Sequence, residues 1–255
     1  MHMEPFDITV IRKGIRERLS RRVSEEVPLT IEVNGNELVT LLASPGDMEN
    51  LVYGCLYNSG FIGKASDVKR LIIDRDRWKA AAELAGPGLT EDMLSKRIHA
   101  SAGKGIFHNL FDVAYQVRMP DGFTVDHKKV EEFIGIFQTA SSEHKETRGV
   151  HSGALADGNG IIIFRDDIGR HNAIDKAVGE ALCRGLGFDD KILMTSGRVS
   201  SEILSKALRC RIPVIVAAGA PTNQAVKLAR SVNLTVVGLA REDIMYIFSG
   251  EKRII

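Results

Sequence analysis

The chain has 255 residues, of which 44% are hydrophobic and 26% are charged, and its formal net charge is +1. This composition is typical of a globular protein with one large or two modest domains. The small net charge gives no global attraction to nucleic acid, and no apolar run approaches the roughly 20 residues that span a bilayer. The N-terminus has no signal-peptide pattern, so we expect a cytoplasmic protein with no nucleic-acid partner and no membrane span.

The three cysteines, Cys55, Cys183 and Cys210, lie far apart and form no CxxC pair. This spacing disfavours both a disulfide framework and a thiolate zinc site, so no metal is expected. Cys55 and Cys183 fall on apolar faces of predicted helices, where burial would keep a thiol unreactive. Cys210 has an arginine on each side, which makes it the most electropositive of the three.

The first half of the chain predicts an α+β unit that ends at residue 122. A basic stretch over 1–26 predicts a solvated strand and loop, with a phosphate-facing edge as the weaker alternative. The segment 29–42 is typical of a hairpin with an Asn34-Gly35 turn. A helix is expected from Met48, with Gly60 as its stop. The remaining expectations are a strand over 67–74, a linker or short helix over 80–88, a short helix over 90–96 and a strand over 111–119.

The second half, 123–255, predicts an α/β domain. It begins with a helix over 128–140 and a hairpin of strands 151–156 and 161–164. Helices and strands then alternate, which is typical of a sheet with a parallel portion covered by helices. The expected helices are 173–184, 200–209 and 222–232, and the expected strands are 192–195, 214–217, 234–239 and 245–248.

The stretch 165–176 separates a buried strand from an amphipathic helix and contains many charges. It holds two carboxylates, a glycine and an Arg-His-Asn triplet, with Asn172 expected as the helix N-cap. Such a concentration of polar groups favours a functional loop. The alternative is a well-capped turn with surface ion pairs.

Three loops follow the ends of consecutive strands: 166–171, 196–198 and 218–222. Ligands of open α/β sheets bind outside the carboxyl ends of strands, and each loop leads into a helix N-terminus, which favours anions. Arg170 and Arg198 would add bidentate contacts to phosphate. The loops therefore predict a ligand that carries phosphate. His151, at the start of a strand and flanked by Gly149 and Gly153, is a further candidate, with a structural role as the alternative.

Four runs of the sequence resemble the formate dehydrogenase accessory sulfurtransferase family, and 44–51 matches the N-terminal half of that family. The runs are Thr147 to Ala154, Asp167 to Lys176, Ser196 to Glu202, and Ala220 to Thr222. The resemblance implies a cytidine-deaminase-like three-layer C-terminal domain, a smaller N-terminal α+β domain and a homodimer.

The resemblance also implies a function. Proteins of this family take sulfur from a cysteine desulfurase and pass it to the molybdenum bis-guanine-dinucleotide cofactor of formate dehydrogenase, as part of molybdenum–molybdopterin cofactor biosynthesis. A guanine nucleotide such as GDP would fit the same site. Together, the loops and the resemblance give these candidate cofactor-binding residues: His151, Asp167, Gly169, Arg170, His171, Asn172, Ser196, Gly197, Arg198, Pro221, Thr222, Leu239, Ala240, Arg241, Glu242, Asp243 and Ile244.

One departure from the family leaves the activity open. The family's persulfide-bearing loop has a CGxCG-like sequence, and the matching segment is His99, Ala100, Ser101, Ala102, Gly103 and Lys104, with no cysteine. The chain is therefore either a sulfurtransferase or a cofactor chaperone without sulfur transfer. A guanine-nucleotide-binding regulator would share the same site. A zinc deaminase is disfavoured because the chain lacks the H-x-E and P-C-x-x-C ligand motifs.

Overall fold

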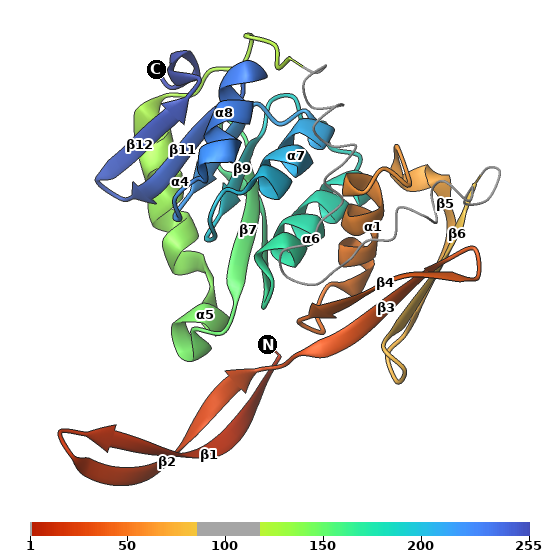
Figure 1. Cartoon of the computed structure of the whole chain (residues 1–255), viewed down its shortest axis with the longest axis vertical. Coiled ribbons are helices and arrows are strands. Elements are labelled where there is room, and N and C mark those ends of the chain that lie inside the picture. The colour runs from red at the N-terminus through yellow and green to blue at the C-terminus, as the bar shows by residue number, and fades with distance from the viewer. Residues whose placement is uncertain (1, 86–117) are drawn as a thin grey trace.

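The computed structural model describes residues 2–85 and 118–255 (Figure 1). These residues form a two-stranded arm, a four-stranded sheet and a six-stranded sheet, with six α-helices. None of the helices in the described ranges is long and apolar enough to cross a membrane. The helix expected over 90–96 and most of the strand expected over 111–119 lie outside the described residues.

The arm consists of β1 (Met3–Arg12) and β2 (Ile15–Ser24), which pair antiparallel around Lys13 and Gly14. It extends away from the rest of the molecule (Figure 1). The sequence predicted a strand and a loop here, whereas the structure pairs two full strands. Lys13 and Gly14 both have positive φ, which closes the tight turn that brings β2 back along β1.

The four-stranded sheet has the order β4-β3-β6-β5 and is covered by α1 (Met48–Asn58). Its strands are β3 (Val27–Val33), β4 (Asn36–Ala43), β5 (Val68–Asp74) and β6 (Lys79–Leu84), and a short 3-10 turn, η1 (Ala65–Asp67), precedes β5. The turn between β3 and β4 lies at Asn34 and Gly35, both with positive φ, as predicted. The predicted helix from Met48 and its stop at Gly60 are also confirmed.

The expectation of a linker or short helix over 80–88 is wrong, because 79–84 is the strand β6. β6 pairs parallel with β3 and antiparallel with β5. Ala80 and Ala82 are buried and point to the same face, where they pack into the core beneath α1. Alanine has a low intrinsic preference for strands, so pairing on both edges and burial on one face decide the conformation.

The six-stranded sheet has the order β12-β11-β10-β9-β7-β8, and its centre is parallel. The strands are β7 (His151–Ala156), β8 (Ile161–Asp167), β9 (Ile192–Thr195), β10 (Val214–Ala217), β11 (Thr235–Arg241) and β12 (Ile244–Ser249). The predicted hairpin and the predicted alternation of helix and strand are confirmed. A short turn, η2 (Glu251–Arg253), follows β12.

Helices cover both faces of this sheet and give a three-layer α/β/α arrangement. One face packs against α6 (Arg170–Cys183), α7 (Ser201–Cys210) and α8 (Asn223–Ser231). The other face packs against α4 (His127–Ala140), whose buried stripe is the one predicted from the sequence. A short helix that the sequence did not predict, α5 (Ser142–Thr147), links α4 to the sheet. The α/β class is confirmed, while the closer likeness to cytidine deaminases stays a prediction.

The two sheets are joined through α1 and α6, which pack closely against each other. A Cβ atom at Gly54 would lie 1.9 Å from the carbonyl oxygen of Asp175, and one at Gly179 would lie 1.9 Å from that of Asn50. Only glycine permits this approach of two helix backbones. A domain boundary at residue 122 stays a prediction, but the helices on its two sides share a backbone-to-backbone contact.

Candidate functional site

The topology brings the predicted loops to one edge of the six-stranded sheet. β9, β10 and β11 run parallel, so the loops that follow them lie at the same edge. β7 runs antiparallel to β9, which places His151 at this edge, and His151 pairs with Asp167 at the end of β8. We call this region, formed by His151, Arg170, His171, 196–198, 218–222 and Arg241, the strand-end site.

The loops of the strand-end site contact one another through their backbones. Thr222 N donates to Val199 O at 2.9 Å, and Leu239 N donates to Gly219 O at 3.1 Å. A Cβ atom at Gly219 would lie 2.6 Å from the carbonyl oxygen of Gly197, so a side chain at 219 would separate the two loops. The site is therefore built on a rigid edge of backbone rather than on independent loops.

Arg170 is the most telling side chain of the strand-end site. It is half-buried and packs its methylenes near Gly197, because a Cβ at Gly197 would lie 2.8 Å from Arg170 Cδ. Its Nε is buried, and among the described residues it has neither a hydrogen-bond partner nor a carboxylate in ion-pair contact. A buried, unpaired guanidinium nitrogen is costly, and an anionic ligand would remove that cost.

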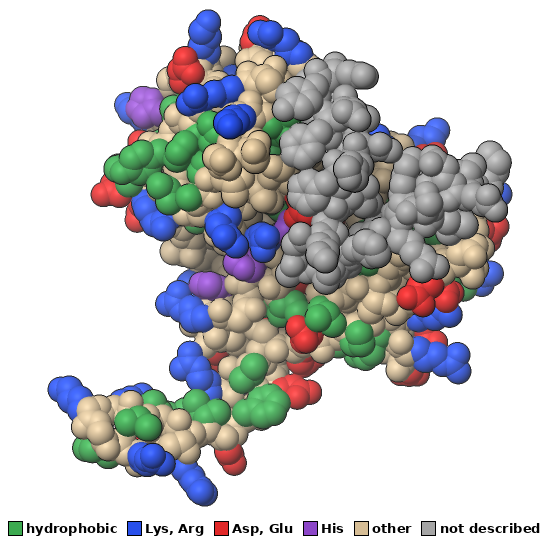
Figure 2. Space-filling view, viewed as in Figure 1, with side chains coloured by type: hydrophobic (Ala, Val, Ile, Leu, Met, Phe, Trp, Pro, Cys, Tyr) green, Lys and Arg blue, Asp and Glu red, His purple; other side chains and the backbone are tan. Residues whose placement is uncertain are grey.

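Two histidines flank Arg170. His151 Nδ1 lies 3.1 Å from Ser196 Oγ, which also accepts a hydrogen bond from Ser152 N at 2.9 Å. Burial lowers the pKa of His151, and the positive charges of Arg170, His144 and His171 lower it further. His151, Arg170, His144 and His171 therefore lie close enough together for their charges to interact. Figure 2 shows histidine and Lys or Arg side chains gathered near the middle of this face.

His171 is positioned by a carboxylate of the next helix. Its Nε2 lies 3.0 Å from Glu202 Oε2, and this hydrogen bond lowers the pKa of Glu202 against the opposing effect of burial. The contact fixes the ring of His171 at the start of α6. The N-cap of α6 is Gly169, which has no side chain to cap the helix, so an anion could accept hydrogen bonds from the backbone N–H groups of the first turn.

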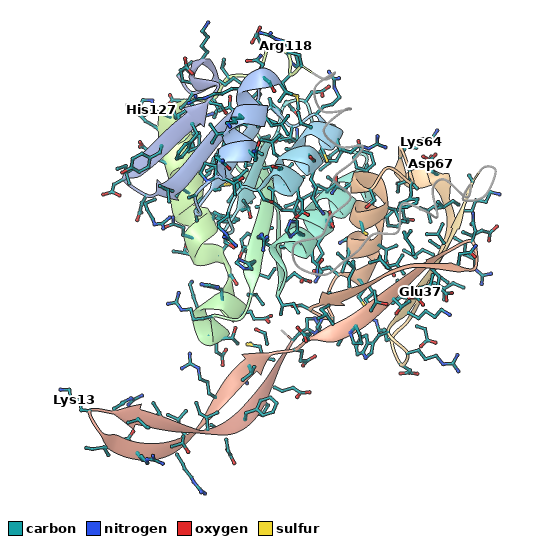
Figure 3. All side chains as sticks on the ribbon, in the orientation of Figure 1. Lys13, Glu37, Lys64, Asp67, Arg118 and His127 are labelled. Carbon is teal, nitrogen blue, oxygen red and sulfur yellow. The ribbon has the colours of Figure 1, made fainter. Side chains whose placement is uncertain are left out.

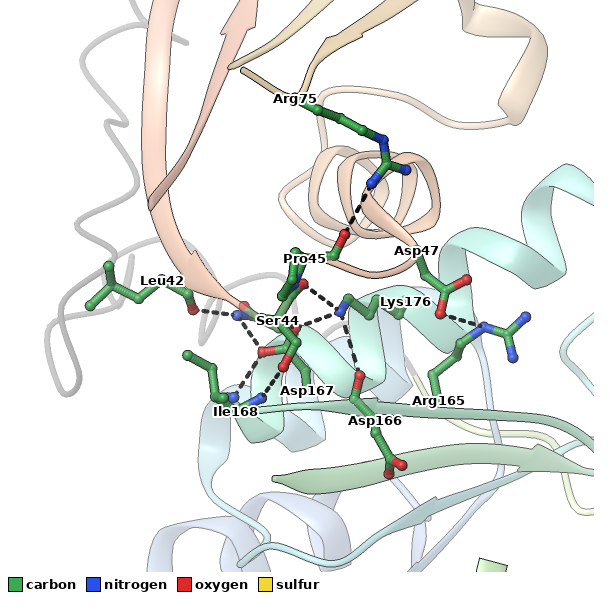
Figure 4. A network of polar contacts seen from close by, with 12 residues as sticks. Leu42, Ser44, Pro45, Asp47, Arg75, Arg165, Asp166, Asp167, Ile168 and Lys176 are labelled. Atoms are coloured by element: carbon green, nitrogen blue, oxygen red, sulfur yellow. Dashed lines mark hydrogen bonds and ion pairs between the residues drawn. The ribbon is translucent and has the colours of Figure 1, made fainter. Parts of the chain in front are cut away.

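The remaining part of the predicted motif lies inside the molecule (Figure 4). Asp167 is fully buried and accepts hydrogen bonds from Ser44 N at 3.0 Å and Gly169 N at 2.8 Å. Its Oδ2 lies 2.7 Å from Lys176 Nζ, which is also buried. Asn172 Nδ2 donates to Asp167 Oδ1 at 3.0 Å and to Leu42 O at 2.8 Å.

This network corrects the expected N-cap and shows what two of the candidate residues contact within the chain. Asn172 is not the N-cap of α6, because the helix already begins at Arg170 and Asn172 lies within its first turn. Asp167 and Asn172 stay candidate cofactor-binding residues, but both carboxylate oxygens of Asp167 and the Nδ2 of Asn172 already bond groups of the same chain. Their role is to tie the 42–44 segment, which follows β4, to the start of α6.

Of the segment 239–244, Leu239 contacts the strand-end loops through its backbone N–H, and Arg241 contacts them through its side chain. Its Nη1 donates to Ala218 O at 2.9 Å. Leu239 has a positive φ of 52° and is 38% exposed, whereas Ala240 is buried. Glu242, Asp243 and Ile244 are exposed in and after the turn between β11 and β12. The segment is thus a strand, a turn and the start of the edge strand.

One of the three cysteines differs from expectation. Cys183 is exposed rather than packed on an apolar face, since it lies in the last turn of α6. Cys55 and Cys210 are buried, and burial raises the pKa of Cys55 to about 12 and also raises that of Cys210. The arginines beside Cys210 in the sequence do not offset its burial. Cys183 is the accessible thiol, although partial burial and Glu49 raise its pKa too.

The segment of the family's persulfide loop, 99–104, lies outside the described residues.

A cavity of about 650 Å³ lies at the opposite end of the six-stranded sheet from the strand-end site. It is lined by residues that precede β11 and follow β12, among them Asn233, Gly250 and Arg253. None of the predicted ligand-binding residues lines this cavity.

Sequence reasoning missed two features of the site. His144 lies on α5, its Nδ1 donates to Val150 O at 2.9 Å, and its charge lowers the pKa of His151. No periodicity marked α5 as a helix, so no signal placed His144 near the strand ends. Ser44 was part of the 44–51 match, and nothing in that pattern indicated its contact. Its backbone N–H donates a hydrogen bond to Asp167, 123 positions away along the chain.

The comparisons with known proteins agree with this arrangement. The model of the FdhD/NarQ family matches residues 24–255. The chain belongs to the FdhD/NarQ family. It is 41% identical over 234 residues to the sulfur carrier protein FdhD of Staphylococcus haemolyticus (strain JCSC1435), covering 90% of this chain and 88% of that protein. It is 37% identical over 238 residues to the sulfur carrier protein FdhD of Geobacillus kaustophilus (strain HTA426), covering 91% and 90%.

A solved structure has the same fold. The crystal structure of a candidate formate dehydrogenase accessory protein from Desulfotalea psychrophila aligns with a TM-score of 0.83 at 22% identity. The alignment covers 100% of both chains. At this identity the likeness shows that the fold is shared. The family model and the curated relatives confirm the predicted family, and the solved structure confirms the mixed α/β fold.

Proposed function

We propose that this protein is an accessory protein for formate dehydrogenase maturation, and that its strand-end site holds the phosphate groups of the molybdenum bis-guanine-dinucleotide cofactor as cargo. The observation that carries the proposal is Arg170, a half-buried arginine whose Nε has no partner among the described residues. The names of the relatives, sulfur carrier proteins of the same family, support the same role.

The chemistry of the site fits a nucleotide pyrophosphate. Arg170, exposed Arg198 and the uncapped N-terminus of α6 supply donors for phosphate oxygens. His151 and His171 would donate further hydrogen bonds when protonated. Backbone contact between the 196–198 and 218–222 loops keeps these donors at fixed positions, which lowers the entropic cost of binding.

Two versions of the function follow, and they differ in sulfur chemistry. In the first, the protein receives sulfur from a cysteine desulfurase and delivers it to the cofactor, which requires an accessible thiolate. In the second, it is a cofactor or guanine-nucleotide-binding chaperone without sulfur transfer. The second version has specific support, because segment 99–104 contains no cysteine and the buried thiols have raised pKa values.

GDP binding measured by calorimetry tests the site. Arg198→Ala should weaken binding by about 1.5–3 kcal/mol, the scale of a hydrogen bond to a charged group, and Arg170→Gln should weaken it by at least as much. Arg70→Gln is the matched control, because Arg70 is an exposed arginine of β5 in the other sheet. Unchanged affinity in both site variants would remove the assignment of the strand-end site.

Co-purification tests the client. The wild-type protein should co-purify with a formate dehydrogenase, and in the sulfur-transfer version also with a cysteine desulfurase. We expect this to take place in the cytoplasm. If Arg170→Gln loses GDP but still retains the formate dehydrogenase, the partner contact is separate from the strand-end site.

A further inference from the structure

The cavity at the far end of the six-stranded sheet is lined by charged side chains that the strand-end site does not use. Among the described residues, four of the lining side chains are basic and two are acidic, which leaves two positive charges in excess. The basic ones are Arg118, Arg230, Lys252 and Arg253, and the acidic ones are Asp121 and Glu251. They come from the segment before α4, the end of α8 and the η2 turn. Figure 3 labels Arg118, which lies at this end of the molecule.

Arg253 is the buried cation of the cavity. It is 3% exposed, and two of its five N–H groups have partners: Nη2 donates to Pro120 O at 2.6 Å, and Nη1 donates to Thr235 Oγ1 at 3.2 Å. Its Nε is buried and has no hydrogen-bond partner among the described residues. Burial lowers the pKa of Arg253, and the charge of Asp121 only partly offsets this effect. A desolvated guanidinium with an unpaired N–H is costly, and an anion in the cavity would compensate its charge.

The walls of the cavity are fixed by contacts within the chain. Thr235 is fully buried, and its Oγ1 donates to Gly250 O at 2.7 Å. Gly250 has a positive φ of 64°, and a Cβ atom there would lie 2.4 Å from Thr235 Oγ1, so the chain after β12 turns this closely only with glycine. Asn233 Nδ2 donates to Met119 O at 2.9 Å, which ties 118–121 to the segment before β11. The cavity therefore keeps its shape without a ligand, which lowers the entropic cost of binding one.

The cavity is separate from the strand-end site. β11 begins beside the cavity at Thr235 and ends at Arg241 in the strand-end site. Because a strand rises by about 3.3 Å per residue, its seven residues put roughly 20 Å between the two places. A group bound at one of them does not contact the other.

The size and the lining of the cavity indicate the class of ligand. Its volume of about 650 Å³ lies within the range of roughly 300–1,000 Å³ that is usual for small-molecule sites. Guanidinium groups bind phosphate through paired hydrogen bonds, and the oxygens of a phosphate point in several directions. One phosphate can therefore meet basic groups from different segments at once. Ala229, Ile247 and Phe248 add an apolar part to the lining, against which the rest of the molecule can pack.

We propose that this cavity binds a small molecule that carries a phosphate or pyrophosphate group. Arg253 is the buried contact, and the exposed Arg230 and Lys252 are contacts at the rim. Arg230 Nε donates to Phe248 O at 3.0 Å, which holds the side chain at β12 and leaves its two Nη groups for the ligand. The cavity binds this ligand whether or not the strand-end site is filled.

Calorimetric titration of inorganic pyrophosphate into the full-length chain tests the cavity. The parent is the Arg170→Gln chain, in which the strand-end site is weakened. Adding Arg230→Gln and Lys252→Gln should weaken pyrophosphate binding at least about tenfold, because charge-assisted hydrogen bonds are lost. Adding Lys227→Gln and Arg70→Gln instead is the matched control, since it removes the same two charges from exposed positions outside the cavity.

The control should keep the affinity of the parent. A parent that binds no pyrophosphate, or an equal loss in both sets of variants, would overturn the proposal. Position 170 is the same in all of these chains, so the outcome does not depend on the function proposed for the strand-end site.

Arg253→Lys, made in the same parent, tests the buried contact. Lysine keeps the positive charge but loses the planar fork of donors, so pyrophosphate should bind at least about tenfold more weakly and should raise Tm less than in the parent. A lower Tm without ligand, together with unchanged pyrophosphate affinity, would mean that Arg253 serves only the fold and would overturn its assigned role. If Arg253→Lys does not fold, the variants of Arg230 and Lys252 decide the proposal by themselves.

Discussion

Replacing Lys176 with methionine should destabilise the protein strongly, although Lys176 touches no ligand. Lys176 and Asp167 are 1% and 0% exposed, and their charged atoms lie 2.7 Å apart. Methionine keeps the length of the side chain but leaves Asp167 as an uncompensated buried charge. Removing one partner of a buried pair costs about 3–5 kcal/mol.

The magnitude should lie at the lower end of that range. Asp167 still accepts hydrogen bonds from Ser44 N, Gly169 N and Asn172 Nδ2, so part of its charge stays compensated. We therefore expect a loss of about 3 kcal/mol in the free energy of unfolding. For a chain of this size, that corresponds to a fall of roughly 6–12 °C in Tm.

Urea denaturation and scanning calorimetry measure this loss. Lys69→Met, at an exposed position of β5, is the control and should change stability by less than about 0.5 kcal/mol. Asp167→Asn combined with Lys176→Met should be more stable than Lys176→Met alone, because the buried charge is then gone. A loss below about 1 kcal/mol for Lys176→Met, or a double variant as unstable as the sum of the singles, would refute the reasoning.

Five further outcomes are expected. GDP binding should strengthen from pH 8 to pH 6, because the lowered pKa of His151 rises again beside a bound phosphate. Binding should then be accompanied by uptake of a proton, which calorimetry in two buffers measures. This uptake should vanish in His151→Gln. Without ligand, stability should fall as the pH drops below about 6.5, since His151 of the unfolded chain binds its proton first, and this fall should be smaller in the same variant. Gly179→Ala should cost more than about 2 kcal/mol, because its Cβ would meet the backbone of α1 at 1.9 Å, whereas Gly187→Ala, with open space around it, should not. Incubation with a cysteine desulfurase and labelled cysteine should give no adduct of about 32 Da in the intact mass, and an adduct on Cys183 would contradict this expectation. Elemental analysis should find no stoichiometric zinc after chelation, and retained zinc would contradict that expectation.

The sequence determined the elements whose hydrophobic period is regular. The stripe of α4 and the alternation of helix and strand after residue 161 needed only the spacing of apolar residues, because that spacing fixes which face is buried. The Asn34-Gly35 turn was equally local, since positive φ at both positions requires such residues. The edge at which the three loops meet also followed from strand direction alone.

Only the tertiary structure decided the roles of individual polar side chains. Arg170 and Asn172 stand two positions apart in one motif. Among the described residues Arg170 Nε has no hydrogen-bond partner, whereas Asn172 Nδ2 donates to Leu42 O and Asp167 Oδ1. β6 formed a strand against the low preference of its alanines. Distant partners take part in both cases: Leu42 lies 130 positions from Asn172, and β3 pairs Thr30 with Lys79 of β6. Burial and hydrogen-bond pairing depend on those distant partners, and a local pattern carries no information about them.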